Sequence, residues 1–122
     1  MSDAIELGKK GEEIALLHLK SNSYNILETN WRFRHLELDI IAMKDNILVV
    51  VEVKTRSSDY FEQPPDTVNR RKQKLIIEAT NSYIDTHDIS QEVRFDIITI
   101  YFSARSYKLD HIEDAFYPVV NK

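Results

Sequence analysis

The sequence contains no cysteine, two glycines and three prolines in 122 residues. The absence of cysteine excludes disulfides, thiolate metal ligands and a nucleophilic thiol. A zinc site is disfavoured as well, because the four histidines are scattered without the spacing of zinc ligands: His18, His35, His87 and His111.

Long apolar runs are also missing from the chain. No stretch approaches the ~20 apolar residues of a membrane span. The N-terminus, Met-Ser-Asp-Ala-Ile-Glu, lacks a basic segment followed by an apolar one. We therefore expect a cytoplasmic protein without membrane contact.

Basic residues are outnumbered, with 16 lysines and arginines against 20 aspartates and glutamates, and the net charge is −4. A pure nucleic-acid binder normally carries a strongly basic surface, so this balance speaks mildly against that class. It does not exclude an enzyme that binds a metal with carboxylates and a phosphate with a local basic patch, because net charge describes the average surface. The length predicts one domain, residues 1–122, and the 43% hydrophobic content allows a single core.

The stretch from Leu36 to Lys54 reads as two apolar strands that carry charges a buried sheet would normally exclude. A tight turn between them sets their pairing, which places Asp39 opposite Glu52 and Glu37 opposite Lys54. The strand period of two predicts a shared face for Leu36, Leu38, Ile40 and Ala42.

Opposed positions of an antiparallel pair have Cβ atoms roughly 4.5–5.5 Å apart, where like charges are destabilising. A proton or cation between Asp39 and Glu52 would relieve the repulsion, and Mg²⁺ suits such oxygen ligands because it keeps several waters. Lys54 shares the face of Glu52 and could steady an attacking water or a developing negative charge. The alternative is a solvated face on which Glu37 and Lys54 form an ordinary ion pair. The apolar run 47–51 favours the metal site, since it places Glu52 at the edge of a core.

Hydrophobic periodicity predicts helices over 5–20 and 69–86, strands over 24–33 and 93–102, and a loop over 55–67 beside the proposed site. The tail is expected to form a short edge strand over 107–109 and a helical turn over 111–116. Gly8 and Gly11 fall in the first helix, where each costs roughly 1 kcal/mol relative to alanine unless something approaches the backbone. Glu12 lies on the side of Leu16 and is a candidate to point toward the sheet, with a simple acid near a helix N-terminus as the alternative.

The second helix is expected to begin at a cap formed by Thr67 or Asn69 and to bury Leu75, Ile76, Ala79, Tyr83 and Ile84. Its first turns carry four cations: Arg70, Arg71, Lys72 and Lys74. Cations oppose the dipole at a helix N-terminus, so the arrangement favours a bound anion, with a solvated basic end as the alternative. Lys72 lies one turn before Ile76 and is the cation expected to face the site.

Aromatic and basic residues alternate in the first strand, where Trp31 and Phe33 are interleaved with Arg32 and Arg34. Such a pattern serves either to pack the aromatic rings against a core or to stack them on nucleic-acid bases. Packing is the more common role.

The order of helix, three strands, helix and strand resembles the α-β-β-β-α-β core of the restriction-endonuclease-like nucleases, an α/β fold with a mixed central sheet flanked by helices. Their signature places an acid on the first helix, an Asp on the second strand and Glu-x-Lys on the third. Here these positions hold Glu12, Asp39 and Glu52-Val53-Lys54.

The chain is still more similar to the YraN family of uncharacterised bacterial proteins, often described as Holliday-junction-resolvase-like. The shared motifs are Gly8-Lys-Lys-Gly11-Glu12, Asn30-Trp-Arg32, Glu37-Leu-Asp39-Ile-Ile-Ala42, Val51-Glu-Val-Lys54-Thr-Arg56, Val68 with Lys72-Gln73, and Arg94-Phe-Asp96. Two positions depart from the family pattern, since Leu36 and Glu62 stand where the family usually has glycine. These changes affect strand curvature and the substrate loop rather than a ligand.

The resemblance implies an endonuclease that hydrolyses phosphodiester bonds in DNA, including branched or junction DNA, with Mg²⁺ or alternatively Mn²⁺. Asp39, Glu52 and the Val53 carbonyl would hold the metal, and Glu12 and Lys54 would complete the catalytic set. The residues expected to contact nucleic acid are Arg32, Arg56, Arg70 and Lys72, and those expected to support the site from behind are Glu37 and Gln73.

Two other functions are also compatible with the sequence. One is a nucleic-acid-binding module on the same fold that does not cut, and the other is an interaction protein whose sheet carries structural ion pairs. Symmetric cutting of a junction would require a homodimer, and the sequence shows no decisive interface signature.

Overall fold

A computed structural model describes residues 2–57 and 67–117 of the chain. It contains, in order, α1 (Ser2–Ser21), β1 (Asn25–Phe33), β2 (Leu36–Lys44), β3 (Ile47–Ser57), α2 (Arg70–His87), β4 (Glu92–Phe102) and β5 (Tyr107–Phe116). The strands form one sheet in the order β1-β2-β3-β4-β5, in which only β3 and β4 are parallel. The expected α-β-β-β-α-β core with a mixed sheet is confirmed.

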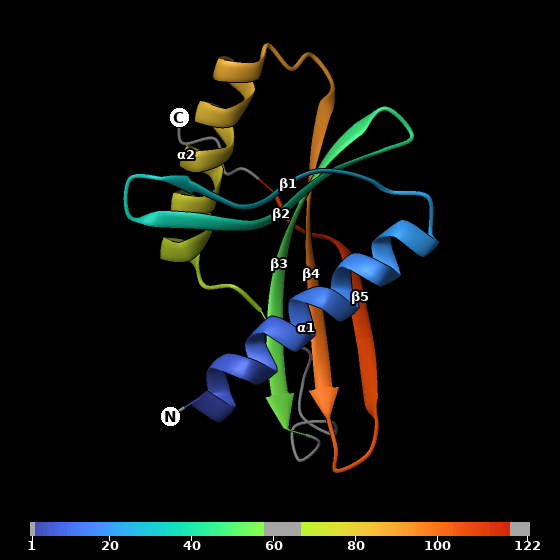
Figure 1. Ribbon diagram of the computed structural model, residues 1–122. Helices are drawn as coiled ribbons and strands as arrows, with labels where there is room; N and C mark the ends of the chain where they lie inside the picture. Colours follow the sequence, from blue (N-terminus) through green and yellow to red (C-terminus); the bar gives the residue numbers. More distant parts are fainter. Residues whose placement is uncertain (1, 58–66, 118–122) are drawn as a thin grey trace.

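The two helices lie on opposite faces of the sheet (Figure 1). One face packs against Ala15 and Leu19 of α1, and the other packs against Ile76, Ala79 and Tyr83 of α2. α2 is the crossover that joins the parallel strands β3 and β4, which require such a connection because a tight turn cannot link them. The strands between the helices are therefore buried on both sides, as the continuous apolar runs predicted.

The β2–β3 hairpin has the predicted register only over its first five pairs, from Lys44 with Ile47 to Ile40 with Val51. Beyond that point the two strands stop pairing and diverge. β2 continues to pair with β1. The β1–β2 hairpin thereby separates from β3 and lies beside α2 (Figure 1). The predicted pairing of Glu37 with Lys54 is therefore wrong, because both residues lie beyond the point where β2 and β3 stop pairing.

A local break in the β1–β2 ladder accompanies this divergence. The pairing passes from Thr29 with Ile40 to Trp31 with Leu38 and skips Asn30 and Asp39 between them. Asn30 has a φ of 52°, in the left-handed region that asparagine tolerates better than most residues. The strand geometry is irregular at Asn30, although the pairs on either side keep the same register.

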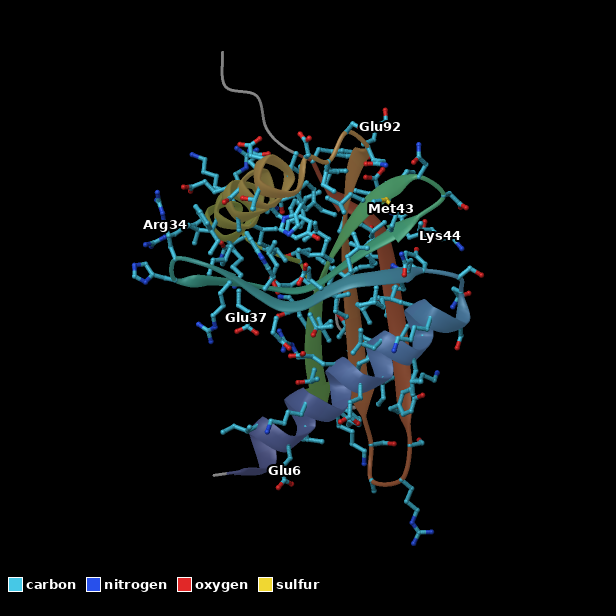
Figure 2. The ribbon with its side chains drawn as sticks, turned by 45° about the horizontal axis from the view of Figure 1, so that its top comes forward. Glu6, Arg34, Glu37, Met43, Lys44 and Glu92 are labelled. Atoms are coloured by element: carbon cyan, nitrogen blue, oxygen red, sulfur yellow. The ribbon has the colours of Figure 1, made fainter. Side chains whose placement is uncertain are left out.

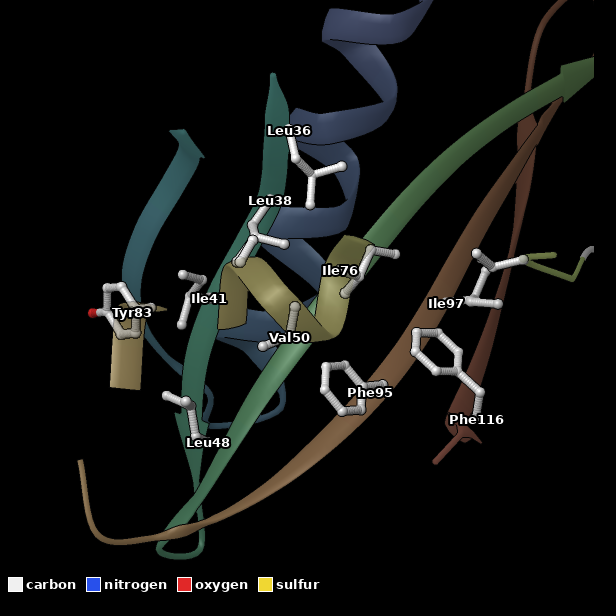
Figure 3. Packing of buried hydrophobic residues seen from close by; sticks show 12 residues of the cluster. Leu36, Leu38, Ile41, Leu48, Val50, Ile76, Tyr83, Phe95, Ile97 and Phe116 are labelled. Atoms are coloured by element: carbon white, nitrogen blue, oxygen red, sulfur yellow. The ribbon is translucent and has the colours of Figure 1, made fainter. Parts of the chain in front are cut away.

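The break also moves side chains from one face of the sheet to the other. Leu36 and Leu38 pack with Ile76 on the α2 side, as Figure 3 shows, whereas Ile40 and Ala42 pack on the α1 side. The expectation that these four strand residues share one face is wrong, because period-two alternation holds only while the strand is regular. Leu36, which stands in place of a family glycine, is thus a buried core residue.

We call the part of the β1–β2 hairpin beyond the break, Trp31–Leu38, the hairpin arm. Arg34 lies at its far end and Glu37 on its side, at the opposite end of β2 from Met43 and Lys44 (Figure 2). Trp31 contacts the Tyr83 ring edge-on at 5.2 Å and stacks with Phe33, so both aromatic rings serve packing. The packing interpretation of the alternating aromatics is confirmed.

The second helix is close to its prediction. Asn69 is the N-cap, and its side chain accepts a hydrogen bond from the Lys72 amide. Leu75 is 42% exposed rather than buried, and the apolar stripe instead includes Thr80, whose hydroxyl donates to the Ile76 carbonyl at 2.7 Å. That local bond allows a polar residue to be buried without an unsatisfied donor.

The predicted helical turn over 111–116 is wrong, because this segment belongs to β5 and pairs with β4 as far as Phe95 with Phe116. The Phe116 ring stacks on Phe95 at 5.0 Å, which anchors the end of the strand in the α2-side core. Of the predicted loop 55–67, the first three residues continue β3, and residues 58–66, Glu62 among them, lie outside the described residues. No helix within the described ranges is long and apolar enough to cross a membrane.

The two glycines of α1 have different roles. A Cβ at Gly11 would lie 2.3 Å from the Thr55 methyl, whereas a Cβ at Gly8 would meet nothing within 4 Å. Only Gly11 therefore marks a close approach of α1 to β3.

We expect Gly11→Ala to destabilise the protein by about 1–3 kcal/mol through overpacking against Thr55. Gly8→Ala should instead stabilise it by up to about 1 kcal/mol through helix propensity. Urea unfolding measures both effects, and Thr55→Ser in the Gly11→Ala background should recover most of the loss because it removes the clashing methyl. Equal unfolding midpoints for the two alanine variants would contradict this assignment.

Candidate functional site

Asp39 and Glu52 lie where β2 and β3 stop pairing. With β2 turned away, the Val53 amide donates a hydrogen bond to the Asp39 side chain, from N to Oδ2 at 2.8 Å. Asp39 therefore caps an amide that continued strand pairing would otherwise have used. The predicted proximity of Asp39, Glu52 and Val53 is confirmed, although side-chain capping rather than regular strand pairing produces it.

The two carboxyl groups are electrostatically strained as a pair. Burial, followed by the hydrogen bond to Glu52 and the charge of that group, raises the pKa of Asp39 to about 8. The Glu52 side chain is only 14% exposed, and its Oε2 lies 4.0 Å from the Lys72 ammonium. Such a pair needs a shared proton or a cation, so it is not the solvated acidic face that was the alternative.

This pKa predicts that the metal-free protein becomes less stable as the pH rises. Between the ordinary aspartate value near 3.8 and about 8, folded Asp39 holds a proton that the unfolded chain has released. The free energy of unfolding should therefore fall through this window, and Asp39→Asn should flatten the fall because the amide carries no charge. Urea titrations from pH 5 to 8.5 in chelator test this, and equal slopes for wild type and variant would contradict it.

Glu12 joins the same site from α1. Asn30 donates to both Glu12 Oε1 at 3.1 Å and Glu37 Oε2 at 2.6 Å, so one amide group links two carboxylates. Burial raises the pKa of Glu12, the Asn30 hydrogen bond opposes that rise, and the charges of Asp39 and Glu37 add to it. Glu12 thus points toward the sheet, as expected, rather than into solvent.

Asn30 is a site residue to which the sequence assigned no role. It belongs to the Asn30-Trp-Arg32 motif, but its function depends on a left-handed backbone that one sequence cannot reveal. The available signal was an asparagine within a strand of otherwise high β-propensity, a position where this residue type is depleted.

Lys54 and Glu37 have separate partners in the structure. Lys54 donates to the Thr67 carbonyl at 3.0 Å, and Glu37 lies 3.3 Å from the Arg32 guanidinium. Glu37 and Lys54 therefore do not form the ion pair that was the alternative, and Lys54 remains on the same face of β3 as Glu52. Lys54 and Glu52 line one open cleft of about 360 Å³, together with Val53, Thr67, Val68, Asn69 and Lys72.

The start of α2 forms the opposite wall of this cleft. Lys72 reaches toward Glu52, as its place on the helix predicted. Gln73 donates to the Val68 carbonyl at 2.6 Å and so fixes the segment that leads into the helix. Arg70 is exposed at the first turn, and Arg56 lies at a different hollow with Leu7 and Phe102. The structure thus brings Lys72 to the acidic pair and leaves Arg56 outside the cleft.

The donor set can be tested for its fit to a divalent cation. In the described part of the chain, no three acid or histidine side chains converge closely enough to hold a metal by themselves. Asp39 and Glu52 nevertheless supply two adjacent carboxyl groups that need a shared proton or a cation between them. Two carboxylates fit Mg²⁺, which usually keeps several waters and takes only one or two carboxylates from the protein.

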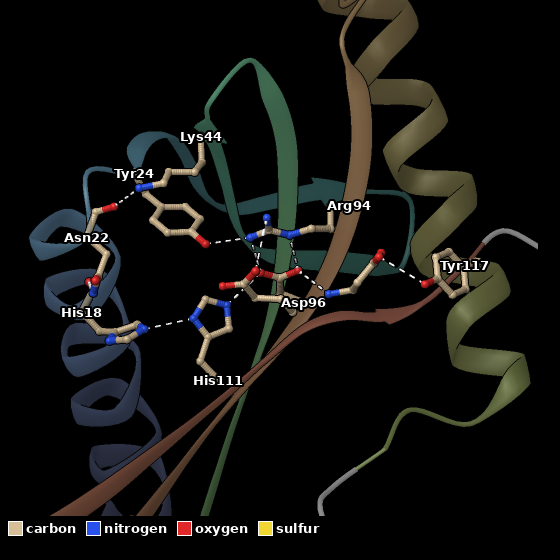
Figure 4. A network of polar contacts seen from close by, with 10 residues as sticks. His18, Asn22, Tyr24, Lys44, Arg94, Asp96, His111 and Tyr117 are labelled. Atoms are coloured by element: carbon tan, nitrogen blue, oxygen red, sulfur yellow. Dashed lines mark hydrogen bonds and ion pairs between the residues drawn. The ribbon is translucent and has the colours of Figure 1, made fainter.

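A second polar cluster lies on the α1 side of the sheet (Figure 4). Asp96 is fully buried and accepts hydrogen bonds from Arg94, His111 and the Asp114 amide. Burial alone would raise the pKa of Asp96, but the bonds from His111, Arg94 and Asp114 outweigh it and hold that pKa below the ordinary value. Asp96 is therefore a satisfied buried carboxylate.

The cluster extends to α1 and the start of β1. His111 contacts His18 between ring nitrogens at 3.0 Å, and Arg94 donates to the Tyr24 hydroxyl at 2.6 Å. Burial, followed by the charge of His111, lowers the pKa of His18. The sequence singled out Arg94 and Asp96 only as a motif, because their partners are remote along the chain. The contacts tie α1 to β4 and β5.

Comparison with known proteins gives a consistent result. The profile of the uncharacterised protein family UPF0102 matches residues 11–100. A UPF0102 protein of Flavobacterium psychrophilum is 49% identical over 117 residues, covering 96% of this chain and 98% of the relative. UPF0102 proteins of Flavobacterium johnsoniae and Parabacteroides distasonis are 48% and 46% identical, each covering more than nine tenths of both chains.

Proposed function

Because the chain belongs to the uncharacterised protein family UPF0102, whose name states no activity, we propose its function from its own site: Mg²⁺-dependent hydrolysis of phosphodiester bonds in DNA. The observation that carries the proposal is the pair of Asp39 and Glu52 at the divergence of β2 and β3. A partly buried acid with a pKa of about 8, hydrogen-bonded to a second carboxyl group, marks a functional-site candidate, because such shifted pKa values cluster at functional sites.

The residues around the pair have complementary chemical roles. Asp39 and Glu52 would hold the cation together with the Val53 carbonyl, and the Val53 amide orients Asp39. When bound there, Mg²⁺ would polarise the scissile phosphate and lower the pKa of an attacking water. The protein itself contributes the position of the carboxyl groups beside the open cleft.

Cations on the cleft walls would bind the substrate. Lys54 is held by the Thr67 carbonyl, which fixes its stem and leaves further ammonium hydrogens for a phosphate oxygen or the attacking water. Lys72 approaches Glu52 from α2 and would contact an adjacent phosphate. Anion binding at this place also uses the N-terminal end of the α2 dipole.

The test is incubation of the purified protein with linear, single-stranded, flapped and four-way DNA in Mg²⁺ or Mn²⁺. Cleavage that requires the metal and stops with chelator supports the proposal. A protein that neither cleaves any of these substrates nor binds Mg²⁺ or Mn²⁺ in calorimetry would overturn it. Matched RNA substrates define whether the sugar matters.

A second candidate is a nucleic-acid-binding module on the same fold that does not cut. The observation behind it is that no third acid or histidine converges on the pair among the described side chains. It predicts DNA binding that weakens steeply with salt, because phosphate contacts release counterions, and no product in the presence of metal. The same substrate panel separates the two functions.

A further inference from the structure

The hairpin arm, Trp31–Leu38, presents two different surfaces. Its aromatic and aliphatic side chains pack toward α2, as Trp31 does against Tyr83 and Leu38 does in the shared cluster. Its other surface and tip carry the exposed cations Arg32 and Arg34, with His35 beside them. The arm is thus anchored on one side and polar on the other.

The turn at the end of the arm places Arg34 in a backbone conformation that is unfavourable for arginine. Phe33 pairs with Leu36, so Arg34 and His35 are the two central turn residues, and Arg34 has a left-handed φ of 57°. Glycine, asparagine and aspartate normally fill such positions. The turn at the other end of β2 follows this rule, because Asp45 and Asn46 occupy its left-handed positions.

An arginine kept in a strained turn suggests that its side chain is needed. A strained, non-glycine left-handed residue is a recognised starting point for a hypothesis of function. The Arg34 guanidinium lies 5.0 Å from the centre of the Phe33 ring, which restricts where the charge can go. Among the side chains that the structure describes, no acid forms an ion pair with it.

The charge of the arm contrasts with that of the chain. The whole protein has a net charge of −4, yet the only acid of the arm, Glu37, is already engaged by Arg32 and Asn30. The arm therefore presents a positively charged tip on an acidic protein. Such a tip is electrostatically complementary to a polyanion.

The arm is also joined directly to the acidic pair. Asp39 follows Leu38, and Asn30 links the base of the arm to Glu12. A strand rises ~3.3 Å per residue, so Arg34, five residues before Asp39, lies about 17 Å from it along the strand. That length corresponds to about five base pairs along a duplex axis at ~3.4 Å each.

We infer that the hairpin arm binds the sugar-phosphate backbone of DNA about five base pairs from the phosphate that a cation at Asp39 and Glu52 would bind, with Arg34 as its principal contact. This inference rests on the proposed function, of which it names a second point of substrate contact. The recognition is electrostatic and independent of sequence, because a single exposed guanidinium reads phosphate rather than base edges.

Arg34→Gly is the sharpest test, since it should change stability and binding in opposite directions. Glycine relieves the left-handed turn and should raise the urea midpoint. Removal of the guanidinium should weaken binding to a fluorescent DNA duplex in chelator about 3- to 10-fold at low salt, and should reduce the slope of log affinity against log salt by about 1. A merely structural arginine would not produce that combination.

Two further variants control the result. Arg105→Gly removes an exposed arginine between β4 and β5 and should leave affinity and slope unchanged. Arg34→Lys keeps the charge and should retain most of the salt slope. If wild type binds DNA and Arg34→Gly binds with the same affinity and slope, the inference is overturned while the proposed function stands. If wild type binds no DNA at any salt concentration, the proposed function fails first.

Discussion

Replacing Glu52 with glutamine is expected to abolish the proposed Mg²⁺-dependent DNA cleavage and at the same time to stabilise the metal-free protein. Glutamine keeps the size of the side chain but removes one of the two carboxylates that meet where β2 and β3 diverge. Cleavage should fall by at least about 100-fold, since even the groups that merely orient metal ligands are worth roughly 10- to 100-fold. The measurement is the initial rate on whichever DNA substrate the wild type cuts.

The gain in stability has the same origin as the loss of activity. In the absence of metal, the burial of Asp39, followed by its hydrogen bond to Glu52 and the charge of that group, raises the pKa of Asp39 to about 8. Without the second negative charge, that pKa should move back toward its ordinary value, and the unfolding midpoint at pH 8 in chelator should rise. Mg²⁺ should then stabilise wild type but not Glu52→Gln, because binding to the folded state alone raises its stability.

Matched substitutions make this result specific. Asp39→Asn should reproduce both effects, and the double variant should be no worse in cleavage than either single one, because the two residues act as one unit. Glu92→Gln, an exposed acid at the start of β4, should leave cleavage and metal response unchanged. Wild-type cleavage rates in Glu52→Gln would exclude the pair as the metal site.

The sequence allowed the elements and part of the register to be predicted because both depend on local physics. Apolar periodicity placed both helices within a few residues, and a tight turn fixed the first five pairs of the β2–β3 hairpin. The side-chain faces of β3 followed from simple alternation, since β3 is regular and paired on both sides in that stretch.

The divergence of β2 and β3 was not predictable from pattern. It coincides with the left-handed conformation of Asn30 and with the packing of the hairpin arm on α2, and both depend on tertiary contacts. The proximity of Asp39 to Glu52 was therefore predicted correctly but the strand pairing between them was not, and Glu37 was assigned to Lys54 instead of Arg32. The candidate site could be located, but its Asn30 link could not.

The buried network around Asp96 shows the same limit for contacts that are remote in sequence. His18, Arg94 and His111 come from α1, β4 and β5, and neither spacing nor composition relates them. The predicted helical turn near His111 failed for this reason too. Pairing with β4 and the Phe95–Phe116 stack determine a strand there, and both are contacts between segments that are separate in the sequence.

The largest loss of stability is expected for Asp96→Ala. Asp96 is the common partner of Arg94 and His111, and its side chain is fully buried. Removal of one member of a buried pair leaves an uncompensated charge and costs about 3–5 kcal/mol. The Arg94 guanidinium, only 17% exposed, would be left without its bidentate partner. Urea unfolding at neutral pH should show this loss.

The second acid beside the Arg94 guanidinium provides the control for Asp96→Ala. Glu113 also approaches Arg94, at 3.6 Å, but its side chain is 61% exposed, so Glu113→Ala should cost less than about 1 kcal/mol. Because the pKa of folded Asp96 is held below its ordinary value, its contribution is present above the unfolded pKa and is lost as the pH falls through the folded one. The stability difference between wild type and Asp96→Ala should therefore shrink only under acid conditions, below about pH 4. Equal losses for the Asp96 and Glu113 variants at pH 7 would show that burial of the network does not determine its contribution.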